Sequence, residues 1–138
     1  MNSDSDDVEA VVRHYFAVVA DLDSTVDDLR PLLAPDAVFV EHPNPISPTG
    51  ERRTTEETVA GFGSGKTLLS AQTIDVHDVL VLGERVAVRS TWRGTVGIEA
   101  GSLSPGDELI AHMGGFLTVR DGLIAEHETY DCYEPFGS

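Results

Sequence analysis

The fold is decided by residues 108–133, which read ELIAHMGGFLTVRDGLIAEHETYDCY. Two runs rich in apolar and β-branched residues, 108–120 and 123–133, flank the dipeptide Asp121-Gly122. Both central positions of a type I′ turn need positive φ, and Asp-Gly between two such runs is a strong hairpin signal. The stretch therefore predicts two antiparallel strands joined by a two-residue type I′ turn.

Two more strands are expected immediately before this hairpin. Residues 71–82 and 85–96 read as strands, and Gly83-Glu84 between them has hairpin length. The segment 97–107 is rich in glycine, serine and proline, which predicts a loop. The second half of the chain therefore predicts four consecutive antiparallel strands.

The N-terminal segment predicts two helices. An i, i+3, i+4, i+7 spacing over residues 6–22 is made by Val8, Val11, Val12, Tyr15, Val18, Val19 and Leu22. This spacing is typical of an amphipathic helix. Ser24 or Thr25 is placed to cap a second helix that ends near Leu33, and Pro31 makes that helix kinked or very short.

A strand and a third helix follow. Residues 37–40 predict a strand that stops at Pro43, and a proline-rich irregular loop comes next. The third helix begins at Thr54, which forms a capping box with Glu57, and is expected to end in the glycines of residues 61–65.

Helices followed by antiparallel strands indicate the α+β class. Long antiparallel strands twist and coil, so we expect a cone-shaped, curved, mostly antiparallel sheet wrapped around three N-terminal helices, with helix 6–22 across its mouth. A wide end that side chains do not fill leaves a pocket for a small organic molecule. The length of 138 residues fits a single domain, 1–138, with residues 1–6 as a disordered acidic tail.

The charge and composition of the chain disfavour several kinds of binding partner and indicate where the protein is located. The net charge is −15, which disfavours nucleic acids and anionic membranes as partners. No apolar run approaches the ~18 residues of a membrane span. The one cysteine, Cys132, cannot form a disulfide within the chain, and a cytoplasmic location is expected.

Four stretches resemble the nuclear-transport-factor-2-like superfamily, within it the SnoaL-like branch. They are Val11-Val12-Arg13-His14-Tyr15, Leu33-Ala34-Pro35-Asp36-Ala37-Val38-Phe39, Val40-Glu41-His42-Pro43 and Arg120-Asp121-Gly122-Leu123-Ile124-Ala125-Glu126-His127. The resemblance implies a cystatin-like α+β barrel that pairs as a homodimer. The superfamily hosts ketosteroid isomerases, polyketide cyclases, epoxide hydrolases, dehydratases and non-enzymatic binding domains, so it implies a fold more strongly than an activity.

Four residues are candidates for catalysis, three of them through the resemblance and Asp131 through its place on one face of the last strand. His42 occupies the place of the isomerases' proton-shuttling aspartate, and imidazole suits a general base near neutrality. Tyr15 matches the tyrosine that donates to an enolate oxygen, with His112 as an alternative donor. Asp131 is expected to orient an imidazole or to act as a second acid or base. The structural alternatives are a strand-end histidine, a core tyrosine and a solvated strand-end aspartate.

Five residues form the expected substrate-binding set, namely Asn44, Trp92, Phe116, His127 and Thr129. The even spacing of His127, Thr129 and Asp131 places these side chains on one face of the last strand. Asn44 between two prolines also suits a plain turn, and the tryptophan suits either a pocket wall or the core.

Cofactor and metal binding are not expected. The five histidines lack zinc-ligand spacing, so no metal site is predicted. Residues 61–67 resemble a phosphate loop only in part, because Ala60 stands where glycine is needed and the segment closes a helix. The favoured hypothesis is a cofactor-independent isomerase, cyclase or dehydratase acting on an apolar oxygenated metabolite, and the alternative is a non-catalytic binding or interaction module.

Overall fold

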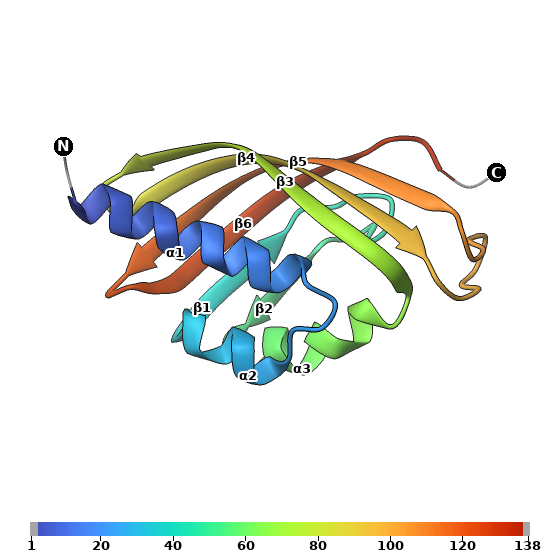
Figure 1. Ribbon diagram of the computed structural model, residues 1–138, viewed down its shortest axis with the longest axis horizontal. Helices are drawn as coiled ribbons and strands as arrows, with labels where there is room; N and C mark the ends of the chain where they lie inside the picture. The colour runs from blue at the N-terminus through green and yellow to red at the C-terminus, as the bar shows by residue number, and fades with distance from the viewer. Residues whose placement is uncertain (1–2, 137–138) are drawn as a thin grey trace.

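A computed structural model describes residues 3–136 of the chain (Figure 1). In order, the elements are α1 (Ser3–Ala20), α2 (Val26–Leu29), the 3-10 helix η1 (Arg30–Leu32), β1 (Leu33–Glu41), β2 (Glu51–Thr54), α3 (Thr55–Lys66), β3 (Leu69–Leu82), β4 (Arg85–Val96), β5 (Glu108–Arg120) and β6 (Leu123–Tyr133). None of the helices within this range has the length and apolar character to cross a bilayer.

The strands form one curved sheet in the order β2-β1-β6-β5-β4-β3. All neighbours are antiparallel except β1 and β6, which are parallel. The predicted α+β class and mostly antiparallel sheet are therefore confirmed. The sheet is an open cone and not a closed barrel, because β2 and β3 are its two edges.

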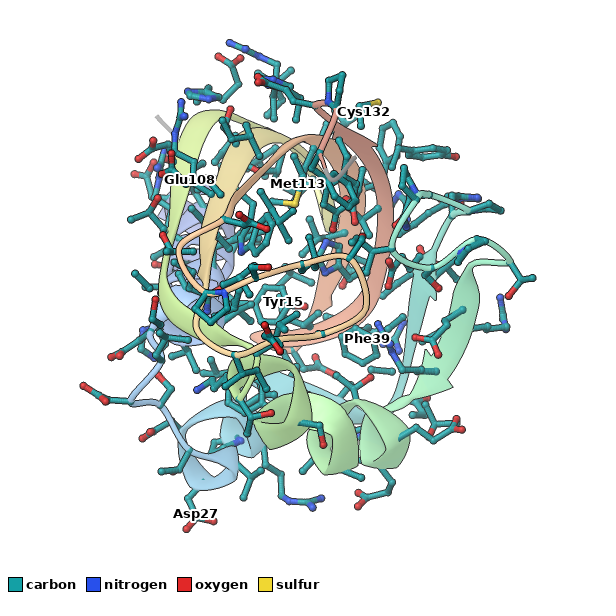
Figure 2. The ribbon with its side chains drawn as sticks, turned by 90° about the vertical axis from the view of Figure 1, so that its right-hand side faces the viewer. Tyr15, Asp27, Phe39, Glu108, Met113 and Cys132 are labelled. Atoms are coloured by element: carbon teal, nitrogen blue, oxygen red, sulfur yellow. The ribbon has the colours of Figure 1, made fainter. Side chains whose placement is uncertain are left out.

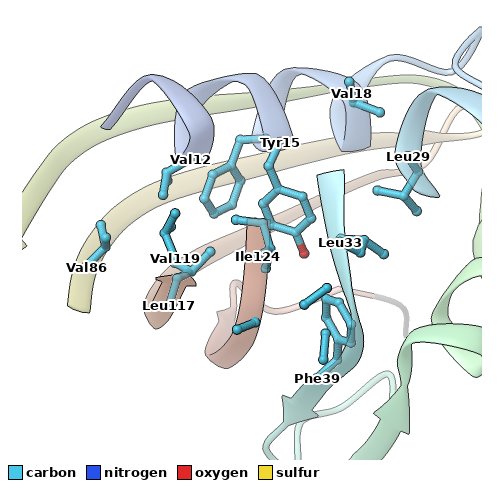
Figure 3. Close-up of a cluster of buried hydrophobic side chains, with 14 of the residues drawn as sticks. Val12, Tyr15, Val18, Leu29, Leu33, Phe39, Val86, Leu117, Val119 and Ile124 are labelled. Carbon is cyan, nitrogen blue, oxygen red and sulfur yellow. The ribbon is translucent and has the colours of Figure 1, made fainter. Parts of the chain in front are cut away.

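The concave face of the sheet is covered by α1 (Figure 1). Figure 3 shows Val12 and Tyr15 of the helix directed toward the strands below them. The largest fully buried side chains are Leu29, Leu117, Ile124, Val12, Val86 and Val96. Burial of the apolar face of α1, which includes Val12 and Tyr15, is the main force that holds this helix on the sheet.

The predicted turn and the bounds of the last three strands agree with the structure, whereas β1 begins at Leu33, four residues before the predicted strand, and β3 begins at Leu69, two residues before it. The type I′ turn is confirmed, since Asp121 and Gly122 have φ of 55° and 76°. Strands β4, β5 and β6 have the expected bounds.

Three local expectations are corrected. The helix α1 begins at Ser3, so residues 3–6 form its first turn and not a disordered tail; residues 1–2 lie outside the described range. The glycines of residues 61–65 do not end α3, which continues to Lys66. The short strand β2 was not expected from its sequence.

Candidate functional site

A cavity of about 300 Å³ opens inside the curve of the sheet, between α1, α2, α3, β1, β2 and β6. Its wall is formed by Tyr15, Val19, Leu29, Phe39, Val40, Glu41, Arg53, Glu57, Thr58, Gly61, Phe62, His127 and Thr129. Figure 2 shows Tyr15 and Phe39 within this curve. Apolar walls with a few polar groups are typical of small-molecule sites.

Tyr15 and His127 form a hydrogen-bonded pair in the wall of the cavity. The tyrosine Oη lies 2.8 Å from His127 Nδ1, and the two rings meet edge to face. Burial raises the pKa of the Tyr15 phenol, against a smaller lowering by the Arg53 guanidinium. Burial also lowers the pKa of His127 to about 4. Both groups are therefore neutral near pH 7.

A neutral pair of this kind always offers one free donor. The phenol and the imidazole carry one acidic proton each, and one of these two protons forms the bond between them. If Tyr15 donates to Nδ1, the proton on His127 Nε2 is free; if Nδ1 donates, the phenol proton is free. Either tautomer therefore leaves the pair with one proton to donate.

One carboxyl group, that of Glu41, lines the same cavity, and a second, that of Asp131, interacts with it from outside the cavity wall. Glu41 lines the cavity, and its strand partner in the register of β1 and β6 is Thr129. Thr129 donates a hydrogen bond of 2.6 Å to Asp131 Oδ1. Burial raises the pKa of Asp131, and the negative charge of Glu41 adds to this, while the bond from Thr129 opposes it. The two carboxyl groups therefore interact, and Asp131 binds a proton more readily than an exposed aspartate does.

Glu41 is held in place from two sides. Asn44 Nδ2 donates to Glu41 Oε2 at 2.8 Å, and an Arg53 guanidinium nitrogen lies 3.5 Å from Oε1. Asn44 Oδ1 also accepts from the backbone N–H groups of Ile46 and Ser47, at 3.0 Å each. Asn44 is thus a turn-forming residue that orients a cavity carboxylate, and it does not itself line the cavity.

His42 lies on the opposite face of the sheet. Its Nε2 is 2.7 Å from Glu128 Oε2, and its ring stacks on Tyr130 at 4.1 Å between centroids. Glu128 and Tyr130 alternate with His127 and Thr129 along β6, so they point away from the cavity. The expectation that His42 works in the same pocket as Tyr15 is therefore corrected.

His112 and Phe116 also face outward. His112 pairs with Glu134 at 2.7 Å, and Phe116 is 44% exposed. Both alternate with inward residues of β5, so neither reaches the cavity. The structure therefore does not bring His42, His112 and Asp131 together.

Trp92 points to the concave side but lies outside the cavity wall. Its Nε1 donates to Gln72 Oε1 at 2.8 Å, and its ring meets Tyr133 edge to face. It is thus a packing residue of the wide end. Within residues 3–136, no three His, Cys, Asp or Glu side chains gather as metal ligands would.

The sequence predictions missed Glu41, Arg53, Thr58 and Phe62. Strand alternation could have revealed Glu41, because it shares a face with Phe39, the largest apolar side chain of β1. Arg53 stands in the polar strand β2, whose four residues carry no apolar pattern. No sequence signal places it in the cavity.

The chain belongs to the SnoaL-like family, because the SnoaL-like domain matches residues 12–127. Among curated proteins, none matches the sequence.

Solved structures have the same fold. One is IdmH from Streptomyces antibioticus, a proposed polyketide cyclase, with 29% identity, coverage of 90% of this chain and 91% of that chain, and a TM-score of 0.74. A proposed ketosteroid isomerase from Kribbella flavida has 22% identity, coverage of 98% and 86%, and a TM-score of 0.62. An epoxide hydrolase of M. tuberculosis resembling limonene epoxide hydrolases has 16% identity, coverage of 92% and 84%, and a TM-score of 0.71. The last two likenesses bear on the fold alone.

Proposed function

We propose that this protein is a cofactor-independent enzyme that moves a proton within an apolar, oxygenated small molecule, as an isomerase, cyclase or dehydratase does. The observation that carries the proposal is the meeting of a neutral Tyr15–His127 donor and the Glu41 carboxylate in one largely apolar cavity. Membership of the SnoaL-like family supports a small-molecule enzyme of this general kind.

In the proposed reaction Glu41 is the general base. Its carboxylate takes a proton from the carbon next to a substrate carbonyl, and the electron pair of that C–H bond forms an enolate. The enolate oxygen accepts the free hydrogen bond of the Tyr15–His127 pair, which acts as an oxyanion donor in a largely apolar site. Glu41 then gives this proton to a different carbon of the substrate, which restores its carboxylate.

Burial suits each group to this work. A neutral imidazole of lowered pKa and a phenol of raised pKa donate a hydrogen bond without ionising. Burial and the charge of Glu41 raise the pKa of Asp131, so this carboxyl group next to the base binds a proton more readily than an exposed aspartate does. Asn44 and Arg53 hold the Glu41 carboxylate in one orientation.

Deuterium uptake tests the proposal before the natural substrate is known. Neutral cyclic and aromatic ketones are incubated with the protein in D₂O, and mass spectrometry measures exchange next to the carbonyl. We expect exchange with the wild type and a loss of about 10²–10⁴-fold with Glu41→Gln, the usual contribution of acid–base catalysis. The adjacent variant His42→Ala is the matched control and should exchange normally, because that ring lies outside the cavity.

The same experiment separates the enzyme from a binding module. Ketones that bind tightly without exchange above background would favour the non-catalytic alternative. A loss of exchange with His42→Ala and not with Glu41→Gln would contradict the proposed base.

We also propose that the protein is a homodimer in the cytoplasm that pairs through the outer face of the sheet. Leu80, Phe116 and Tyr130 are 67%, 44% and 45% exposed there and line a shallow groove of about 290 Å³. The register aligns Leu80, Ala87 and Phe116 in one row across three strands. A contiguous apolar row on a sheet face supports association with a second copy.

A further inference from the structure

Helix α3 carries a buried hydroxyl that has no partner. Thr58 lines the cavity, and its Oγ1 is the one buried side-chain nitrogen or oxygen atom within residues 3–136 that makes no hydrogen bond. A buried polar atom without a partner destabilises a protein, so such an atom calls for an explanation. Three residues earlier, Thr55 shows the ordinary arrangement: its Oγ1 donates to the Ala34 carbonyl and accepts from the Ala37 N–H.

The part of α3 that follows Thr58 is held weakly. Gly61, Gly63 and Gly65 stand in this half of the helix, and a Cβ atom built on each would meet no atom within 4 Å. Packing therefore does not require glycine at these positions, although glycine lowers helix stability at each of them. The sequence thus keeps this half of α3 easy to deform.

Both ends of α3 are anchored. Thr54 caps the first turn, and Lys66 Nζ donates to the backbone carbonyls of Asp21 and Ser24 at the last turn. Phe62 lies between the two anchors, lines the cavity and sits under the Lys66 ammonium at 4.0 Å. A shift of the glycine-rich half would therefore move Phe62 and open the wall next to Thr58 while the helix stays attached.

We infer that Thr58 is a specificity-determining residue of the cavity. When the glycine-rich half of α3 shifts and opens the wall, the Thr58 hydroxyl forms a hydrogen bond with a polar atom of the ligand. The inference rests on the proposed function of this cavity and assigns the ligand a second polar group, a carbonyl or a hydroxyl, on the side that faces α3. A ligand of this class supplies the hydrogen bond that the free protein lacks.

Two threonine-to-valine variants test the inference through stability. Thr58→Val should raise the Tm by about 1–4 °C, because it removes an unpaired polar atom without changing shape. Thr55→Val is the matched control on the same helix and should lower the Tm by about 5 °C or more, because it leaves two buried backbone groups unpaired. A fall of the Tm with Thr58→Val would show a bonded structural hydroxyl and overturn the inference.

Binding of two probes completes the test. Thr58→Val should weaken 6-hydroxy-2-acetylnaphthalene, which has a carbonyl and a hydroxyl, by about 3- to 10-fold, the loss expected for one hydrogen bond, and leave 2-acetylnaphthalene, which lacks the second polar group, unchanged. Equal affinity of wild type and Thr58→Val for the hydroxyketone would overturn the inference and leave the proposed function standing. Hydroxyketone binding that is unchanged by His127→Gln but weakened by Thr58→Val would contradict the proposed donor and support the inference, and failure of the wild type to bind either probe would overturn both.

Discussion

Acidification should destabilise the protein through His127. Burial lowers the pKa of its imidazole to about 4, whereas a histidine of an unfolded chain titrates near pH ~6.5. Between these values the unfolded chain binds one proton more than the folded protein, so the free energy of unfolding rises with pH across this window. Each unit of pKa difference corresponds to about 1.4 kcal/mol of unfolding free energy, so the full loss of stability is about 3 kcal/mol. About 2 kcal/mol of this loss occurs between pH 7.5 and 5.0.

Urea unfolding of the wild type and of His127→Gln at several pH values measures this effect. The glutamine variant cannot be protonated, and both proteins share every other histidine and carboxylate. The free energy of unfolding of the wild type should therefore fall by about 2 kcal/mol more than that of the variant between pH 7.5 and 5.0. Parallel pH profiles for the two proteins would refute the burial argument for the Tyr15–His127 pair.

Two further predictions concern the packing around two glycines and the proposed dimer. Gly63→Ala should stabilise the protein by about 0.5–1 kcal/mol, since its methyl group meets nothing within 4 Å; Gly94→Ala should destabilise it by about 1–3 kcal/mol, since its Cβ would lie 2.4 Å from the Trp92 ring. Chemical denaturation compares the two, and the same sign for both would contradict the packing described. In sedimentation at micromolar concentration we expect a dimer for the wild type and for Ile98→Glu, and a monomer for Phe116→Glu; a monomeric wild type would contradict the dimer.

The strands could be predicted because their signals are local. The Asp121-Gly122 turn fixes which residues pair in the last hairpin, and alternation fixes which of them face inward. The strand β2 could not be predicted, because its four residues, Glu51–Thr54, have no apolar pattern and owe their conformation to pairing with β1. In the same way α3 continues through three glycines because its ends are anchored by contacts remote in sequence.

Only part of the candidate site could be predicted from the sequence. Tyr15, His127 and Thr129 were predicted, and they lie together in the cavity wall. His42 was predicted because it stands where the resemblance places the isomerases' aspartate, whereas Glu41 was not among the predicted residues; a position in the sequence does not say which face of the strand its side chain occupies. A shift of one residue along a strand exchanges the two faces of a sheet, so the neighbour of an expected residue can occupy the site in its place.

The donor and the fold depend on the same contacts. Tyr15 belongs to the buried core beneath α1, next to Phe16, and the same packing removes water from His127. The pKa of His127 is low because α1 is seated on the sheet, and loosening of the helix would let water reach the imidazole and allow it to be protonated. A protonated imidazole no longer accepts the Tyr15 proton and places a positive charge in the cavity wall. Protonation of His127 and detachment of α1 therefore favour each other. Stability should begin to fall as the pH drops below ~6.5, whereas the donor of the folded protein titrates only near its pKa of about 4, so the Tyr15–His127 donor should be lost at a lower pH than the first loss of stability.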